Sequence, residues 1–294
     1  MGLGPPILAL YRQLKQLGAL EGIDSVVELG SQGVWCPDPR LLNGLFQAFG
    51  RQSLSHAEMA PYLNASGTGH APSRDLHERL GFTYRCVDID GKFGSLTLDI
   101  NFDSVPPEHR GTYGLTSNHG TTEHLLDQRN AFQMIHDLTR PGGLMLHALP
   151  FTVHLEHGFF NYQPNLFEAL ARFNSYETLG IWVGPDWSLS SLVPWESRLL
   201  DYLTLNAKTT HLLVVLQRKL HDKEFQVPVQ TVYETMIPES SAARYQFVVD
   251  GELYSGARLQ QVTREIRDVN LNQIPMTVLA RHLKQRVMKR LLRR

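Results

Sequence analysis

Short apolar segments that end in polar or acidic residues recur along the first part of the chain. They predict buried strands at 26–29, 84–87, 96–100, 113–119 and 144–149. Between them, apolar residues at helical spacing predict helices at 5–17, 40–49, 73–81 and 126–138. Strands that alternate with helices indicate an α/β fold built on a parallel sheet.

The pattern continues less densely up to residue 218. It predicts a loop at 154–164, a helix at 165–173, a strand at 178–183, a helix at 196–205 and a strand at 211–217. We therefore predict one domain over 1–218 and a C-terminal extension over 219–294. The extension should contain a β-hairpin about Asp250–Gly251 and a terminal helix.

The turn after the first strand carries candidate ligand-binding chemistry. Glu28 lies near the end of that strand, and Gly30 and Gly33 follow it. Glycine lets the backbone approach a ligand closely and adopt a positive φ. A dinucleotide site favours G-x-G-x-x-G without a carboxylate at its start. Glu28 therefore argues against a nicotinamide-dependent oxidoreductase.

Polar residues also follow the next three predicted strands. Asp88 ends the second strand, Asp99 ends the third, and Asn118 and His119 end the fourth. Ligands of open parallel sheets bind beyond the carboxyl ends of the strands. We expect these side chains to line one crevice.

The order and spacing of these motifs, with the turn Pro141-Gly142-Gly143 before the fifth strand, resemble class I S-adenosylmethionine-dependent methyltransferases. The resemblance covers roughly residues 20–218. It implies a Rossmann-like, seven-stranded, mostly parallel sheet with helices on both faces and a last strand that runs antiparallel. The sequence departs from the family where Val34-Trp35-Cys36 replaces the third glycine of the usual loop.

The resemblance also implies S-adenosyl-L-methionine as the cofactor and assigns residues to it. These are Glu28 at the end of the first strand; Gly30, Ser31 and Gly33 under the methionine part; Asp88 and Ile89 at the ribose; Asp99 and Ile100 beside adenine; and Asn118 and His119 at the methyl-donor pocket.

Histidines are the candidate bases for methyl transfer, since their ordinary pKa lies near ~6.5. His119 and His124 bracket the segment after the fourth strand, while His147, His154 and His157 lie on or after the fifth. We predict that His154 or His157 is the base and that His119 lies nearer the cofactor.

The loop after the fifth strand supports two further interpretations. His154 and His157, with His147 or Glu156, form an alternative ligand set for zinc or iron. Gly158 and the aromatic residues after it indicate a loop rather than a helical face, so no metal ligand is assigned. In that aromatic run, Asn161 and Tyr162 are predicted to contact the substrate, because small-molecule pockets combine apolar walls with a few polar groups.

The composition bears on which partners the protein binds and on where in the cell it is expected. The 294 residues carry a formal net charge of −1, which gives no sign of a nucleic-acid partner. Cys36 and Cys86 are far apart, which favours a reducing, cytoplasmic location, and we expect neither a secretory signal nor a membrane span. The basic amphipathic segment Val278–Arg294 favours a helix docked on the core, and peripheral contact with an anionic membrane is the alternative.

The sequence thus predicts a methyltransferase that O-methylates a small-molecule acceptor such as a sugar or a specialised metabolite. The alternative is a non-catalytic binding or scaffold protein that keeps the fold; the acidic strand ends speak against it. The sequence leaves the oligomeric state open.

Overall fold

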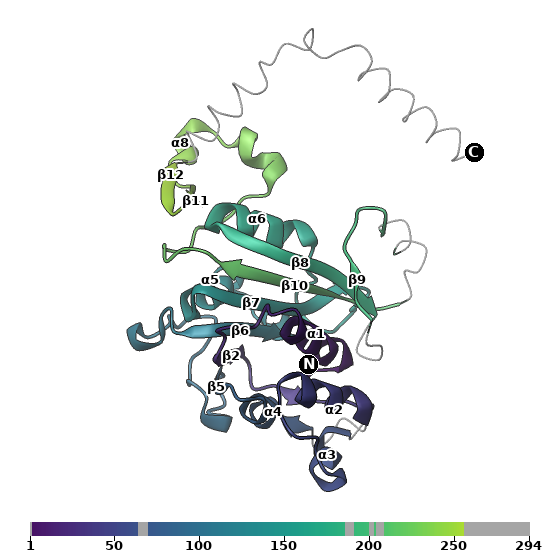
Figure 1. The fold of residues 1–294 in the computed structure, drawn as a ribbon. Coiled ribbons are helices and arrows are strands. Elements are labelled where there is room, and N and C mark those ends of the chain that lie inside the picture. Colours follow the sequence, from purple (N-terminus) through teal and green to yellow (C-terminus); the bar gives the residue numbers. More distant parts are fainter. Residues whose placement is uncertain (1, 64–69, 186–190, 200–202, 204–208, 256–294) are drawn as a thin grey trace, which may run out of the picture.

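A seven-stranded sheet forms the centre of the molecule (Figure 1). The computed structural model describes residues 2–63, 70–185, 191–199, 203 and 209–255. In spatial order the strands are β5 (Thr83–Val87), β2 (Ser25–Leu29), β6 (Tyr113–His119), β7 (Thr139–Thr152), β10 (His211–Lys219), β8 (Tyr176–Pro185) and β9 (Val193–Pro194).

Most of these strands run in one direction. β2 is parallel to β5 and β6, and β6 is parallel to β7. β10 is antiparallel to both β7 and β8, so β8 points the same way as β7, and β9 is antiparallel to β8. A mostly parallel sheet with a late antiparallel strand is confirmed. The chain therefore has a Rossmann-like α/β fold.

Helices cover both faces of the sheet, as predicted. One face packs against α1 (Pro5–Gln16), α2 (Pro39–Ala48) and α4 (Ser73–Leu80), and the other against α5 (Gln128–Leu138) and α6 (Pro164–Asn174). Side chains alternate along β2. Val26 therefore packs in the core on the side of α1, α2 and α4, while Val27 and Leu29 pack in the core on the side of α5 and α6. Glu28, between them, faces the side of α1 and α4.

The strand predicted at 96–100 is wrong. The only β contact recorded there among the described residues is an isolated parallel bridge between Val87 and Leu96. A 3-10 turn, η1 (Lys92–Gly94), precedes the bridge, and afterwards the segment bonds to itself. The N–H of Leu98 donates to the Leu96 carbonyl (2.9 Å), and the N–H of Asp99 donates to the Asp103 carboxylate (2.7 Å). These local bonds replace the ladder that a strand would need.

Several elements were not predicted. The long connection between β2 and β5 contains α3 (His56–Leu63), and a small sheet joins β1 (Gly2–Leu3), β3 (Gly33–Val34) and β4 (Ala71–Pro72). The remaining short elements are η2 (Pro107–His109), η3 (Thr122–His124), η4 (Thr231–Met236) and α8 (Glu239–Ala242).

The C-terminal extension begins with the predicted hairpin, made of β11 (Gln246–Val249) and β12 (Glu252–Ser255). Asp250 and Gly251 have φ of +49° and +78°, as in a two-residue hairpin turn of type I′. Phe247 packs on Phe173 of α6, with ring centroids 6.4 Å apart.

Two predicted helices cannot be placed. Half of 196–205 and all of 278–294 lie outside the described residues, and the division into two domains stays a prediction. Within the described part of the chain, none of the helices combines the length and apolar character that crossing a bilayer requires.

Candidate active site

The turn after β2 is held by backbone bonds to β5. Gly30 has a φ of +79°, and its N–H donates to the carbonyl of Val87 (2.8 Å). The next N–H, that of Ser31, donates to Asp88 Oδ2 (2.6 Å). A Cβ on Gly30 would lie about 2.5 Å from the Thr121 hydroxyl, so the position requires glycine for both its conformation and its close packing.

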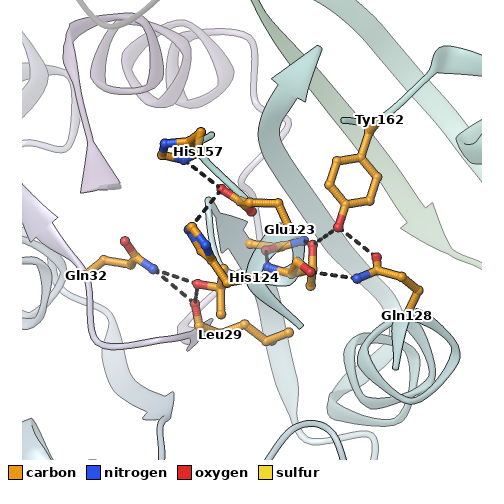
Figure 2. A network of polar contacts seen from close by, with 10 residues as sticks. Leu29, Gln32, Glu123, His124, Gln128, His157 and Tyr162 are labelled. Carbon is orange, nitrogen blue, oxygen red and sulfur yellow. Dashed lines mark hydrogen bonds and ion pairs between the residues drawn. The ribbon is translucent and has the colours of Figure 1, made fainter. Parts of the chain in front are cut away.

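The side chain of Gln32 joins this turn to the segment that follows β6. Its Nε2 donates to the Leu29 carbonyl (3.2 Å) and to Thr121 Oγ1 (2.9 Å), and Thr121 Oγ1 donates to the same carbonyl (2.6 Å) (Figure 2). Gly33, which was expected under the methionine part of the cofactor, instead lies in β3 between β1 and β4. The turn after β2 is therefore shorter than expected and consists mainly of Gly30 and Ser31.

Glu28 is closed off from the crevice. Its carboxylate has no solvent exposure and accepts hydrogen bonds from the hydroxyls of Ser73 and Tyr84 (2.8 Å for Tyr84). Burial raises its pKa to about 7 although these hydrogen bonds lower it. His77, whose Nδ1 lies 3.9 Å from Glu28 Oε1, has a pKa lowered by burial to about 4, so it is neutral near pH 7. In this conformation Glu28 anchors α4 to the sheet and does not face a ligand.

The residues predicted at the ribose and at adenine lie at an accessible end of the sheet. Asp88 is half-buried, and its carboxylate accepts the N–H groups of Ser31 and Asp90, the latter at 3.2 Å. Ile89 beside it is 67% exposed. Further along, Asp99 is half-buried and Ile100 packs into the core.

The end of β6 is joined to the same edge. Asn101 Oδ1 accepts the N–H groups of Leu126 and Asp127, each at 3.1 Å. Gln32 ties the turn after β2 to Thr121, so the carboxyl ends of β5, β2 and β6 are joined at one end of the sheet. That Asp88 and Asp99 line one crevice there stays a prediction.

A polar network shapes the segment after β6. Asn118 is buried, and its Nδ2 donates to Thr122 Oγ1 (2.9 Å). The Tyr162 hydroxyl lies 2.9 Å from Thr122 Oγ1 and 2.7 Å from Gln128 Oε1 (Figure 2). Asn118 and Tyr162, which were predicted to touch cofactor and substrate, hold η3 in place in this structure. Tyr162 is thus a positioning residue for Glu123, the middle residue of η3.

Glu123 and two imidazoles form a cluster beside the crevice. Glu123 has no solvent exposure, yet neither of its carboxylate oxygens accepts a hydrogen bond from the described residues. Its Oε1 lies 3.7 Å from His124 Nε2 and 3.5 Å from His157 Nε2, and both imidazoles are partly exposed (Figure 2). Burial raises the pKa of Glu123 to about 7 and lowers the pKa of His124. The cluster can accept a proton near neutral pH.

The other predicted catalytic histidines are engaged elsewhere. His119 has no exposure and shares a face of the sheet with Glu28; burial lowers its pKa to about 3. His154 is also buried, and its Nε2 lies 3.0 Å from the His211 carbonyl. Among the predicted bases, His157 is the one that the structure places in the cluster.

Exposed apolar side chains surround the cluster. A cavity of about 560 Å³ is lined by Phe102, Leu126 and Phe159 together with His124. These three apolar residues are 73–85% exposed. A second cavity of about 430 Å³ lies between α5 and α6 and is lined by Asn161 and Tyr162. The predicted substrate residues therefore border a cavity, but a different one from that beside His124.

Sequence comparison gives no relatives, since neither a protein-family model nor a curated protein matches the chain. Solved structures with similar folds include three methyltransferases. The 1,6-didemethyltoxoflavin-N1-methyltransferase of Burkholderia thailandensis, with bound S-adenosylhomocysteine, is 14% identical over 71% of this chain and 78% of that chain (TM-score 0.35). A SAM-dependent methyltransferase of Archaeoglobus fulgidus is 10% identical over 70% of this chain and 92% of that chain (TM-score 0.37).

The third is the 16S rRNA (adenine(1408)-N(1))-methyltransferase of Catenulisporales acidiphilia, 10% identical over 76% of this chain and 96% of that chain (TM-score 0.38). Because the identities are low and the TM-scores lie below 0.5, we assign the fold from the strand order and strand directions of this chain alone.

Proposed function

We propose that this protein is an S-adenosylmethionine-dependent methyltransferase whose acceptor is the hydroxyl of a small molecule. The observation that carries the proposal is the meeting of the glycine turn after β2 with the half-buried carboxylate of Asp88, at the carboxyl ends of β5, β2 and β6. Ligands of this sheet architecture bind at such an edge.

The residues at this edge suit the cofactor. Asp88 offers a carboxylate to the ribose hydroxyls, and the exposed Ile89 offers an aliphatic surface to adenine. Gly30 and Ser31 bring the backbone close to the methionine part. Glu28 fixes α4 against the sheet through its hydrogen bond with Ser73, so its contribution to cofactor binding is indirect.

When bound, the cofactor supplies an electrophilic methyl group: its sulfur–carbon bond breaks with the electron pair left on sulfur, a bond forms to the acceptor oxygen, and the hydroxyl proton passes to a protein base. The cluster of Glu123, His124 and His157 is the proposed proton acceptor. Positioning of the two reactants supplies much of the rate, and a base adds about 10²–10⁴-fold.

The walls beside the cluster favour a particular kind of acceptor. Phe102, Leu126 and Phe159 form an exposed apolar surface, and such a patch in a soluble protein marks a binding site. We infer an acceptor with an apolar body and a reactive hydroxyl, which favours a specialised metabolite over an unsubstituted sugar. Buried, free Cys36 and Cys86 support a reducing, cytoplasmic location.

The test is transfer of a labelled methyl group from S-adenosylmethionine to a panel of hydroxylated acceptors that differ in apolar area. We expect labelled ether products from the apolar members and strong loss of product with Glu123→Gln. Binding of S-adenosylhomocysteine without transfer to any acceptor would instead favour a non-catalytic binding protein.

A further inference from the structure

We propose that Glu123, His124 and His157 bind a divalent transition-metal ion, with zinc and iron(II) as the ions that the ligand set favours. The binding stands on the geometry of these side chains. The role of the ion in activating the acceptor rests on the methyltransferase function proposed above.

The distances suit a shared ion. The three potential ligand atoms, one from each residue, all lie within 4.8 Å of one another. Glu123 Oε1 is 3.5 Å from His157 Nε2 and 3.7 Å from His124 Nε2. A tetrahedral ion about 2.1 Å from each ligand separates its ligand atoms by roughly 3.4 Å. Adjustments of a few tenths of an ångström bring the two carboxylate–imidazole pairs to this separation, and the two imidazole nitrogens, which lie within 4.8 Å of each other, would close on the shared ion.

The carboxylate lacks other partners. A buried polar atom without a hydrogen bond is costly and needs an explanation. Both oxygens of Glu123 are in this state among the described residues, whereas in the buried Glu28 only Oε1 is, because Oε2 accepts hydrogen bonds from Ser73 and Tyr84. A cation between Glu123 and the two imidazoles would satisfy the carboxylate.

The backbone builds this arrangement. The N–H of Phe159 donates to the Glu123 carbonyl (2.7 Å), which fixes the loop that carries His157. A Cβ on Gly158 would lie 2.9 Å from both Cγ and the carbonyl oxygen of Glu123, so glycine allows this close approach. On the other side, Thr122 holds η3 through Asn118. The three side chains are therefore preorganised by segments after two different strands.

The ligand types define the ion. Two imidazoles and one carboxylate suit zinc or iron(II), while magnesium favours oxygen ligands. Three protein ligands leave coordination positions for water or an acceptor oxygen, as in catalytic sites. A hydroxyl bound to such an ion would give up its proton more readily to solvent, so with the ion bound the three side chains would act as its ligands and not as the base. The apolar cavity beside His124 would place the acceptor next to that ion.

The experiment uses the full-length chain after treatment with a chelator. Zinc binding is measured by competition calorimetry, and cobalt(II) binding by the visible absorption bands that report its coordination. Wild type should bind one ion per chain. His124→Ala, His157→Ala and Glu123→Gln should each weaken binding by about 100-fold or more, since even loss of a supporting contact costs about 10–100-fold.

The matched control is His56→Ala, which removes an exposed histidine of α3 and should leave metal affinity unchanged. Thermal unfolding and S-adenosylhomocysteine binding are measured on every variant. Absence of metal binding by folded wild type, equal affinity in the three ligand variants, or displacement of cobalt by equimolar magnesium would overturn the inference. If metal fails to bind while S-adenosylhomocysteine binds, the metal site alone is rejected; the reverse result rejects the proposed function.

Discussion

Glu28 in β2 and Glu123 in η3, which follows the neighbouring strand β6, are two buried acids that differ in what surrounds them. Burial raises the pKa of each to about 7. Glu28 is enclosed by α4 and β5 and accepts hydrogen bonds from Ser73 and Tyr84. Glu123 accepts none from the described residues and faces two partly exposed imidazoles. The two acids therefore share burial and a raised pKa, and they differ in that both oxygens of Glu123, but only Oε1 of Glu28, lack a hydrogen bond from the described residues.

The sharpest way to break this comparison is to remove each side chain at pH 5, where both carboxyls are largely protonated. Glu28→Ala removes the acceptor that the buried hydroxyls of Ser73 and Tyr84 share and opens a cavity, so we expect a loss of about 3 kcal/mol in the free energy of unfolding. Glu123→Ala removes packing but orphans no hydrogen-bond partner, and we expect a loss of about 1 kcal/mol. Urea unfolding of both variants measures the difference, and equal losses would contradict the contrast.

The pH dependence of Glu123→Gln gives the next largest effect. The carboxyl of Glu123 has a pKa of about 7 when folded and ordinarily 4.5, so the folded chain binds more protons between these values. Stability of the wild type must then fall as pH rises through that window, by up to about 3 kcal/mol. Glutamine does not ionise, so the variant does not lose this stability as pH rises.

Relative to wild type, Glu123→Gln should therefore gain stability between pH 5 and pH 8 when chelator is present. Denaturant unfolding at both values measures the gain. Saturating zinc should stabilise the wild type but not the variant. A gain that is independent of pH would show that Glu123 is ionised in the folded chain at pH 5.

The smallest effect comes from two tyrosines that support the two acids. Tyr84→Phe and Tyr162→Phe each remove one hydroxyl that makes two hydrogen-bond contacts, and we expect each to cost about 1 kcal/mol. Tyr162→Phe should also weaken metal binding by roughly 10-fold, because Tyr162 helps to hold η3. Tyr84→Phe should leave metal affinity unchanged, and equal effects of the two variants on metal binding would argue against separate roles.

Much of the fold could be predicted from the sequence because its signals are local. Apolar runs marked β2 and β6, and Gly81, with a φ of +102°, ended α4 where glycine predicted. The segment at 96–100 was misassigned because Leu98 and Ile100 alternate as in a strand but pack from an irregular segment. Periodicity reports burial, and it does not report hydrogen-bond partners.

The sequence predicted the site less completely than the fold, because the contacts of the site residues depend on how distant segments pack together. Asp88 and His157 could be found from strand ends and residue type. The sequence could not show that Glu28 points at Ser73 and Tyr84, which requires the α4 packing. Glu123 and His124 stood beside the predicted His119, but only the loop contact through Gly158 brings His157 to them. Such contacts between distant segments leave no periodic signal.

Titration calorimetry with S-adenosylhomocysteine tests the central claim, that the crevice beside Asp88 binds the cofactor, most directly. Wild type, Asp88→Ala and a control, Asp24→Ala, would be compared. Asp24 directly precedes β2 and therefore lies at the amino end of that strand, away from its carboxyl end. We expect micromolar binding to wild type and to the control, with a loss of at least about 10-fold in Asp88→Ala, which is 1.4 kcal/mol or more. Absence of binding to folded wild type at millimolar ligand, or equal affinity in Asp88→Ala, would contradict the account.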